Sequence, residues 1–362
     1  MKQLTALAGA PLAANLLAQA LADNNSPANG LSNSVSLGDE ASRKGILYGS
    51  AVGKASLSLD QPYAELIARQ CKIVVPESEM KWKTLRPTPD RYVFDAGDWI
   101  VRWAESHGIV VHGTALVWHE ALPAWFEGYA NKNNARELMV NHIKTVVGHY
   151  VGKMHSWDVV NEGLLETGLR DTPFLRLIGP EYMDLAFQTT AEADPKAIRV
   201  YNDMYVEESN NDVKRRLLLK LLEDMLSRKV PVQALGIQGH LRSDMGGFDA
   251  KKLRAFLRQV AGLGLQIFIT ELDMRDQSPA NDVGTRDAAI ARYCEDFLST
   301  VLEEKAVTVV ISWGLTDRYT WLSGKAPRSD GQPVRPLPFD QNLAPKPVFA
   351  AMAKAFDDAP NR

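Results

Sequence analysis

Two glutamates stand at the ends of apolar, strand-like runs that lie far apart in the chain. Glu162 follows the run 157–160, and Glu271 follows the run 266–270. Glutamate is rarely buried unless something pairs with it, so an acid at the end of an apolar strand is unusual as pure structure. Glycoside hydrolysis needs two carboxyl groups across one cleft: one protonates the leaving oxygen, and the other attacks the anomeric carbon or activates water. Spacing alone leaves open that these are two unrelated surface glutamates.

The elements that must position these acids alternate regularly along the chain. Strand-like apolar runs cover residues 46–52, 71–76, 109–118, 157–160, 197–201, 234–238, 266–270 and 307–313. Amphipathic helical patterns between them cover residues 97–107, 133–151, 212–229, 251–262 and 286–304. This α/β alternation predicts a single-domain (β/α)8 TIM barrel with right-handed crossovers. The alternative is a doubly wound open sheet, but residues 49–53 lack the glycine-rich phosphate turn typical of that fold.

The predicted strands end in polar or aromatic residues, although their interiors are mostly apolar. In a barrel of this kind the active site lies at the carboxyl-terminal mouth. The residues that reach this rim include Glu77, Lys81, Trp118, His119, Asn161, Glu162, Asn202, Asp203, Gln238, His240, Glu271, Asp273 and Trp313. Core packing does not account for polar groups at so many strand ends. The pattern therefore favours paired glutamates in one cleft.

The composition of the chain limits the size of its core and the kinds of partner it could bind. The chain has 362 residues, of which 45% are hydrophobic and 23% charged, so it can bury a large core. A net charge of −3 gives no sign of a nucleic-acid or membrane partner. Cys71 and Cys294 sit in apolar patterns and are expected to be buried free thiols. The histidines show no metal-ligand triad in their spacing, so neither a metal nor another cofactor is expected.

The N-terminal residues have the character of a targeting segment. A weakly basic start is followed by an Ala/Leu-rich run and by the small-x-small sequence 20–22. Residues 1–22 are therefore predicted to be a secretory signal peptide, with a frayed helix as the alternative. Residues 23–41 read as a linker and 42–358 as the catalytic domain, in a protein that is secreted or periplasmic.

Several of these segments resemble family 10 glycoside hydrolases, the endo-β-1,4-xylanase family. Residues 157–162 (Trp-Asp-Val-Val-Asn-Glu) and 269–273 (Ile-Thr-Glu-Leu-Asp) are similar to the two signature segments of that family. The resemblance extends to residues 77–82, 118–119, 201–203, 238–240, 313–321 and 343–347, and it covers residues 45–356. It implies a monomeric endo-β-1,4-xylanase that hydrolyses xylan or xylo-oligosaccharides by a retaining double displacement.

The resemblance also implies a role for each strand-end residue. Glu162 would be the general acid/base and Glu271 the nucleophile, with their carboxyl groups about 5 Å apart. Since like charges at that distance do not both ionise easily, the pKa of Glu162 is expected to be raised. His240 would keep Glu271 ionised, and Asp273 would orient the imidazole. Asn161 would donate a hydrogen bond to the sugar 2-hydroxyl.

Sugar binding needs flat apolar faces and polar groups that match the hydroxyls. The residues assigned to substrate binding are Glu77, Lys81, Trp118, Tyr201, Gln238, Trp313 and Trp321. The tryptophans would stack on pyranose rings, Glu77 and Lys81 would bind glycone hydroxyls, and Tyr201 and Gln238 would support the nucleophile.

The chain departs from the family pattern on the glycone side. Ser78 replaces Asn, Thr114 and Ala115 replace His-Thr, and Ala121 replaces Gln. Each change shortens a side chain, which leads to the hypothesis of altered glycone specificity, for a decorated xylan or another β-glycan. The alternative is that His112 and Glu120 refill the space and plain xylanase activity remains. A barrel that only binds glycans is a further alternative, although both glutamates are present. A metal-dependent hydrolase is a third, which strong chelation would test.

Overall fold

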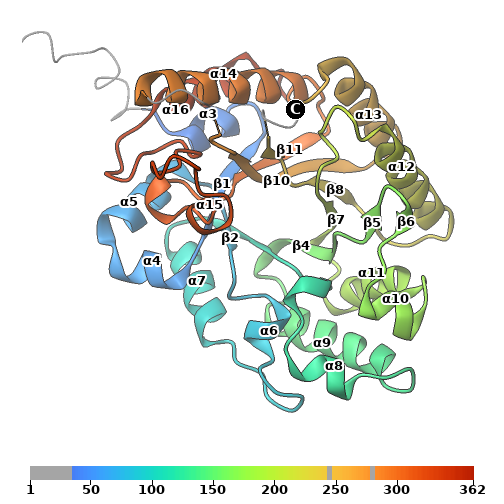
Figure 1. The fold of residues 1–362 in the computed structure, drawn as a ribbon. Coiled ribbons are helices and arrows are strands. Elements are labelled where there is room, and N and C mark those ends of the chain that lie inside the picture. The colour runs from blue at the N-terminus through green and yellow to red at the C-terminus, as the bar shows by residue number, and fades with distance from the viewer. Residues whose placement is uncertain (1–34, 243–246, 278–281) are drawn as a thin grey trace, which may run out of the picture. The chain divides into compact units, whose positions relative to one another are not determined.

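The computed structural model describes residues 35–242, 247–277 and 282–362, and its folded unit begins at Ser36 (Figure 1). Eight parallel strands form its central sheet: β1 (Leu47–Val52), β2 (Ile73–Pro76), β3 (Val110–Gly113), β4 (Met154–Asn161), β7 (Ile198–Asp203), β8 (Ala234–Ile237), β10 (Gln266–Met274) and β11 (Val307–Ser312). They run in the order β11-β1-β2-β3-β4-β7-β8-β10, and β10 also pairs with β11, which closes the barrel. The predicted TIM barrel is confirmed.

Helices follow the strands and surround the barrel in Figure 1. The long ones are α5 (Gln61–Gln70), α7 (Asp95–Ser106), α9 (Ala135–His149), α11 (Tyr182–Ala193), α12 (Asp212–Ser227), α13 (Ala250–Gly262), α14 (Val283–Val301) and α16 (Pro347–Asp358). The amphipathic patterns identified α7, α9, α12, α13 and α14. They missed α5, α11 and α16, although α5 carries a start signal: Asp60 accepts a hydrogen bond from the Tyr63 amide, and Pro62 lies in the first turn.

Short elements fill the connections. They are α3 (Leu37–Ser42), α4 (Lys54–Leu59), α6 (Trp82–Leu85), η1 (His119–Ala121), α8 (Trp125–Tyr129), β5 (Leu164–Leu165), β6 (Gly168–Leu169), α10 (Pro173–Ile178), β9 (His240–Leu241), η3 (Asp317–Tyr319) and α15 (Leu322–Lys325). Of the residues described, no helix has the length and apolar character needed to span a membrane.

The third predicted strand is shorter than its apolar run. Residues 109–118 were expected to form one strand, but β3 ends at Gly113. Beyond it the chain stays beside β4 only through local contacts, such as the amide of Val117, which donates to the carbonyl of Val159 at 3.0 Å. The residues from Thr114 to Val117 remain buried, so apolar character continues after the strand geometry has ended. This departure forms the loop that carries Trp118 to the mouth.

The N-terminal boundary also differs from the prediction. Helix α3 (Leu37–Ser42) begins inside the range 23–41 that was read as a linker and ends one residue beyond it. The Ser36 hydroxyl caps this helix and donates to the carbonyl of Arg69 at 2.9 Å, and Leu37 and Ala41 are buried. A six-residue helix with two buried side chains is too short to give a periodic signal. The predicted signal peptide, residues 1–22, lies outside the described residues.

The barrel interior is a packed core below the mouth. Its buried members include Ala51, Ile73, Val75, Val200, Ala234, Phe268, Val309, Ile311 and Trp313. Gly113 allows Trp157 to pack closely, because a Cβ at this glycine would lie 2.1 Å from the indole ring. Trp157 is fully buried, as are the two free thiols of Cys71 and Cys294.

Buried ion pairs stabilise the long connection that follows β11. Trp321 lies in this connection. Lys346 pairs with Asp317 at 2.8 Å, and both side chains are at most 5% exposed. Arg328 reaches Asp276, just beyond β10, at 3.1 Å. Breaking such pairs leaves an uncompensated buried charge, so these contacts hold the connection in place.

Candidate active site at the carboxyl ends of the strands

Glu162 follows the last residue of β4 and has a positive φ of 57°. A non-glycine residue in this region stores about 1–3 kcal/mol of strain, which is common at functional sites. Its amide donates to the carbonyl of Asn202 at 2.9 Å, so β7 holds the turn. Oε1 of Glu162 accepts a hydrogen bond from Gln238 Nε2 at 2.9 Å. Oε2 is buried and has no hydrogen-bond partner within the described part of the chain.

The environment of Glu162 favours its protonated form. Burial is the largest influence and raises the pKa of this carboxyl to about 7, to which the negative charge of Glu271 adds. The hydrogen bond from Gln238 acts in the opposite direction. The expected direction of the shift is therefore present, although desolvation contributes more to it than the paired carboxylate does.

Glu271 lies on β10 and is 8% exposed. Its Oε1 accepts from Asn202 Nδ2 at 2.9 Å, and its Oε2 lies 3.2 Å from His240 Nε2. Thr270 donates its hydroxyl to Asn202 Oδ1 at 2.7 Å, which fixes the orientation of that amide. Both oxygens of Glu271 thus face hydrogen-bond donors, which stabilise a carboxylate.

A chain of side-chain hydrogen bonds joins the two glutamates. Asn161 Oδ1 accepts from Asn202 Nδ2 at 3.0 Å and from Gln238 Nε2 at 3.4 Å. Asn202 also donates to Glu271, and Gln238 also donates to Glu162. The two strand-end acids that the sequence singled out therefore belong to one connected site.

His240, Asp273 and Trp321 form the outer support of Glu271. His240 Nδ1 lies 2.9 Å from Asp273 Oδ1, and Asp273 Oδ2 accepts from Trp321 Nε1 at 2.7 Å. Burial lowers the pKa of His240, but the carboxylates of Asp273 and Glu271 outweigh it, so the pKa is raised well above its usual value. This direction favours the imidazolium form, which can donate to Asp273 and to Glu271. Both contacts predicted for His240 are present.

Lys81 and two tryptophans line the opposite part of the site. Lys81 Nζ lies 4.9 Å from the ring centroid of Trp118 and 5.6 Å from that of Trp313, both within cation–π range. Burial lowers the pKa of Lys81, while Glu271 and Glu77 oppose that shift. Burial also raises the pKa of Glu77. The negative charge of Glu271 acts on both groups and raises the pKa of each.

Two assignments from the sequence need correction. Tyr201 was expected to bind substrate and support the nucleophile, but it is fully buried and its hydroxyl donates to Asp203 at 2.8 Å. The adjacent Asn202 makes the predicted contact with Glu271 instead, because successive side chains of a strand point to opposite faces. Gln238 was expected to bind substrate on the nucleophile side, and its side chain donates to Glu162 rather than to Glu271. Asn202 belongs to the motif 201–203, but the sequence pattern of a single asparagine at a strand end does not distinguish a catalytic-site residue from a structural cap.

His112 does not fill the space left by the three shortened side chains on the glycone side. Thr114 and Ala121 are buried, at 2% and 1% exposure. His112 does not refill that wall, because it lies inside the barrel, with Nδ1 2.7 Å from Ser156 Oγ and Nε2 3.1 Å from Asp158 Oδ2. Its place within β3, before the strand ends, directs it into the core.

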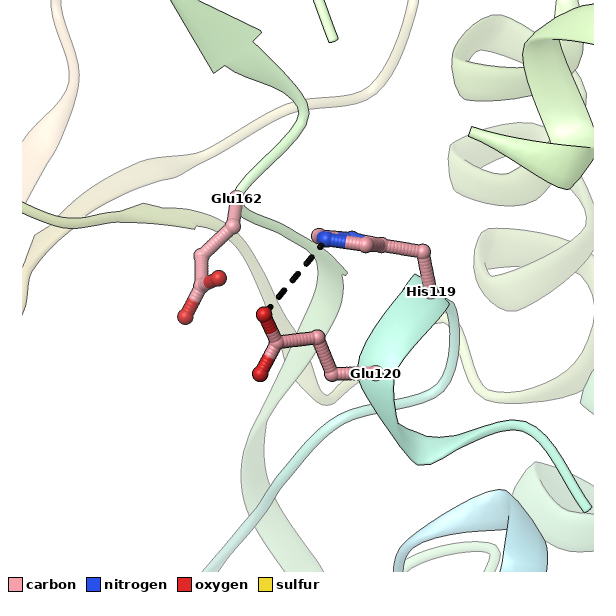
Figure 2. Close-up of side chains that lie close together, drawn as sticks. All are labelled: His119, Glu120 and Glu162. Carbon is pink, nitrogen blue, oxygen red and sulfur yellow. Dashed lines mark ion pairs between the residues drawn. The ribbon is translucent and has the colours of Figure 1, made fainter. Parts of the chain in front are cut away.

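Within the described ranges, one group of side chains has a geometry that could hold a metal ion. His119, Glu120 and Glu162 each offer an atom within 4.8 Å of the other two, and Figure 2 shows the three side chains converging. Sequence spacing did not reveal this group, because Glu162 comes from a different strand end than the η1 turn.

Comparison with known proteins agrees with this geometry. The sequence profile of glycosyl hydrolase family 10 matches residues 36–355. Endo-1,4-beta-xylanase B of Thermotoga neapolitana is 34% identical over 88% of this chain and 90% of its own length. Endo-1,4-beta-xylanase B of Paenibacillus barcinonensis is 37% identical over 80% of this chain and 90% of its own.

Solved structures agree in fold. The crystal structure of xylanase 10B from Thermotoga petrophila RKU-1, in complex with xylobiose, superposes with a TM-score of 0.83 at 35% sequence identity. The match covers 89% of this chain and 97% of that one. The chain belongs to glycosyl hydrolase family 10.

Proposed function

We propose that this protein is a retaining endo-β-1,4-xylanase, with Glu271 as nucleophile and Glu162 as general acid/base. The observation that carries the proposal is the hydrogen-bonded connection between these two carboxyl groups, one favouring a proton and the other surrounded by donors. Relatives that match most of the chain are named endo-1,4-beta-xylanases, which supports xylan as the substrate.

In the first step, Oε1 or Oε2 of Glu271 attacks the anomeric carbon of the sugar. The bond from that carbon to the glycosidic oxygen breaks, and Glu162 transfers its proton to this oxygen as the leaving sugar departs. The Oε2 atom of Glu162, buried and without a partner among the described residues, is available for this hydrogen bond. The product of this step is a glycosyl ester on Glu271.

In the second step, the ester removes the negative charge of Glu271. Glu162 is a carboxylate at this point because it gave its proton to the leaving oxygen, and the loss of the Glu271 charge lowers its pKa and so favours that form. It takes a proton from a water molecule, whose oxygen attacks the anomeric carbon and displaces Glu271. The two successive displacements retain the configuration at that carbon.

Support for each glutamate comes from different neighbours. His240, held by Asp273, places Nε2 3.2 Å from Glu271 Oε2 and so orients this carboxyl group for attack. Asn161 accepts from Asn202 and Gln238 through Oδ1, which orients its amide nitrogen for a bond to the sugar 2-hydroxyl. Such a bond strengthens in the transition state.

A second candidate function is retaining hydrolysis with altered glycone recognition. It rests on Ser78, Thr114 and Ala121, whose short side chains are not replaced by His112, while the exposed Glu120 remains the group that could fill the space. Losing each hydrogen bond to a sugar hydroxyl costs about 0.5–1.5 kcal/mol. The wall that remains would suit a decorated xylose unit.

The proposal also covers the setting of the reaction. The protein is exported through the segment 1–22 and acts as a monomer on xylan-type polysaccharide or oligosaccharides. Support for export is the Ala/Leu-rich run followed by a small-x-small sequence. The mass of the mature protein after expression with secretion machinery, and its size in solution, test these two points.

A panel of xylan, cellulose, mixed-linkage glucan and aryl glycosides, read out by product mass, tests the substrate. Xylan should give a series of xylo-oligosaccharides from internal cleavage. A chain that releases products only from cellulose or mixed-linkage glucan contradicts the assignment.

A further inference from the structure

His119 and Glu120 lie in the η1 turn and approach the acid/base candidate Glu162 (Figure 2). His119 Nε2 is 3.9 Å from Glu120 Oε1, and one ligand atom of each residue lies within 4.8 Å of the others. His119 is 16% and Glu120 61% exposed in its side chain, so one end of the cluster is open to solvent. The retaining mechanism uses Glu162 but assigns nothing to His119 or Glu120.

A second observation points to a ligand at this position. Glu162 is 3% exposed, and its Oε2 atom has no partner of ordinary hydrogen-bond geometry among the residues described, although the Trp118 indole lies close enough to lower the pKa of this carboxyl. A buried acceptor without a partner is unfavourable, and more so when the group is charged. During turnover the glycosidic oxygen satisfies this atom. Between turnovers it is available to another ligand.

The donor set selects the class of ligand. One imidazole nitrogen and two carboxylate oxygens suit Zn²⁺ and other late first-row divalent ions. Mg²⁺ and Ca²⁺ prefer sites made of oxygen alone. Bonds to zinc are about 2.0–2.2 Å long, so the three atoms must approach one another, which the exposed Glu120 side chain can do by changing rotamer. The guanidinium of Arg170, which donates to the backbone carbonyl of Glu162 at 2.8 Å, is a positive charge beside the site and opposes a cation there.

We propose that His119, Glu120 and Glu162 form an inhibitory binding site for a zinc-like divalent cation. A cation on Glu162 occupies the carboxyl that must carry the catalytic proton, and it stands where the glycosidic oxygen would lie. Binding is therefore competitive with substrate. The inhibition rests on the proposed role of Glu162, whereas the cation site itself rests on the geometry of the three side chains.

Calorimetric titration of zinc chloride into chelator-stripped protein tests the site without substrate. We expect one site in the wild type, and an affinity at least about tenfold weaker in Glu120→Gln and in His119→Gln, since even outer-shell partners of a metal are worth that much. The matched control is Glu127→Gln, an exposed glutamate on α8 outside the cluster, which should bind zinc as the wild type does. Circular dichroism checks that each variant is folded.

Kinetics on an aryl xyloside provide the second measurement. Zinc should raise KM without lowering kcat, added chelator should reverse the effect, and Mg²⁺ at the same concentration should not inhibit. Equal zinc affinity in the wild type and in folded Glu120→Gln overturns the site, and inhibition that lowers kcat at constant KM overturns its competitive action. A protein that binds zinc as predicted but cleaves no xylan would instead refute the proposed substrate, so the two failures are distinguishable.

Discussion

Asn202 donates through one amide nitrogen to both Asn161 and Glu271, at 3.0 and 2.9 Å. This residue is therefore the physical link between the acid and the nucleophile halves of the site. Thr270, which donates to its carbonyl oxygen, fixes which end of the amide faces Glu271.

Replacing Asn202 by Ala should reduce kcat/KM by about ten- to a hundredfold. The variant removes a hydrogen bond to a charged group, worth about 1.5–3 kcal/mol. Thr270→Val, which loses only the orienting bond, should show a smaller loss. Steady-state kinetics on an aryl xylobioside measure both. A Thr270→Val defect as large as that of Asn202→Ala would mean that the link acts through general packing rather than through the amide.

The pH dependence should follow the raised pKa of Glu162. The free enzyme needs this carboxyl protonated, so kcat/KM should be full well below the pKa and fall as pH rises through about 7. The negative charge of Glu120 also raises this pKa, so Glu120→Gln should move the basic limb to lower pH. Profiles are recorded with chelator present. A basic limb that stays in place in Glu120→Gln would show that the two carboxylates do not interact.

The two glutamates should differ in what their loss permits. Glu271→Ala should abolish turnover on every substrate, because no glycosyl ester can form. Glu162→Ala should lose most activity on xylan but keep some on aryl glycosides with good leaving groups, which need little protonation. Added azide should then accelerate the Glu162→Ala variant and yield a β-glycosyl azide. Azide rescue of Glu271→Ala, with no effect on Glu162→Ala, would reverse the roles.

The shortened glycone wall predicts a preference among substrates. Linear and branched xylo-oligosaccharides of equal backbone length should be compared by kcat/KM. If nothing compensates for the three shortened side chains, kcat/KM on linear substrates should be up to about a hundredfold lower than in an enzyme that keeps all three longer side chains. Branched substrates should be favoured. Efficient cleavage of linear chains and poor cleavage of branched ones would contradict altered glycone recognition and indicate ordinary endo-xylanase activity.

The sequence predicted the parts of this site that are local to strand ends. Glu162 and Glu271 follow apolar runs, and His240 and Asp273 are near neighbours in motifs, so their positions could be read from the chain. The hydrogen-bond partner of each side-chain amide could not be predicted in this way. Tyr201 and Asn202 are adjacent, and which of them faces the mouth depends on the alternation of β7, which a short buried run does not reveal.

Long-range packing explains the other misses. His112 was named as a group that could refill the glycone wall, whereas it lies within β3 and contacts Ser156 and Asp158 inside the barrel. The cluster of His119, Glu120 and Glu162 joins a turn to a distant strand end, which no spacing rule detects. Helix α11 combines alanines with Thr189 and Thr190 on its buried side, which weakens the apolar periodicity.

The stereochemistry of the first-formed product tests the central claim most directly. Proton NMR of the wild-type reaction on a β-linked xylo-oligosaccharide resolves the two anomers of the new reducing end before they interconvert. A double displacement through Glu271 predicts that the β-anomer appears first and that the α-anomer grows in by mutarotation. An initial excess of the α-anomer would mean a single displacement by water, and would contradict Glu271 as nucleophile.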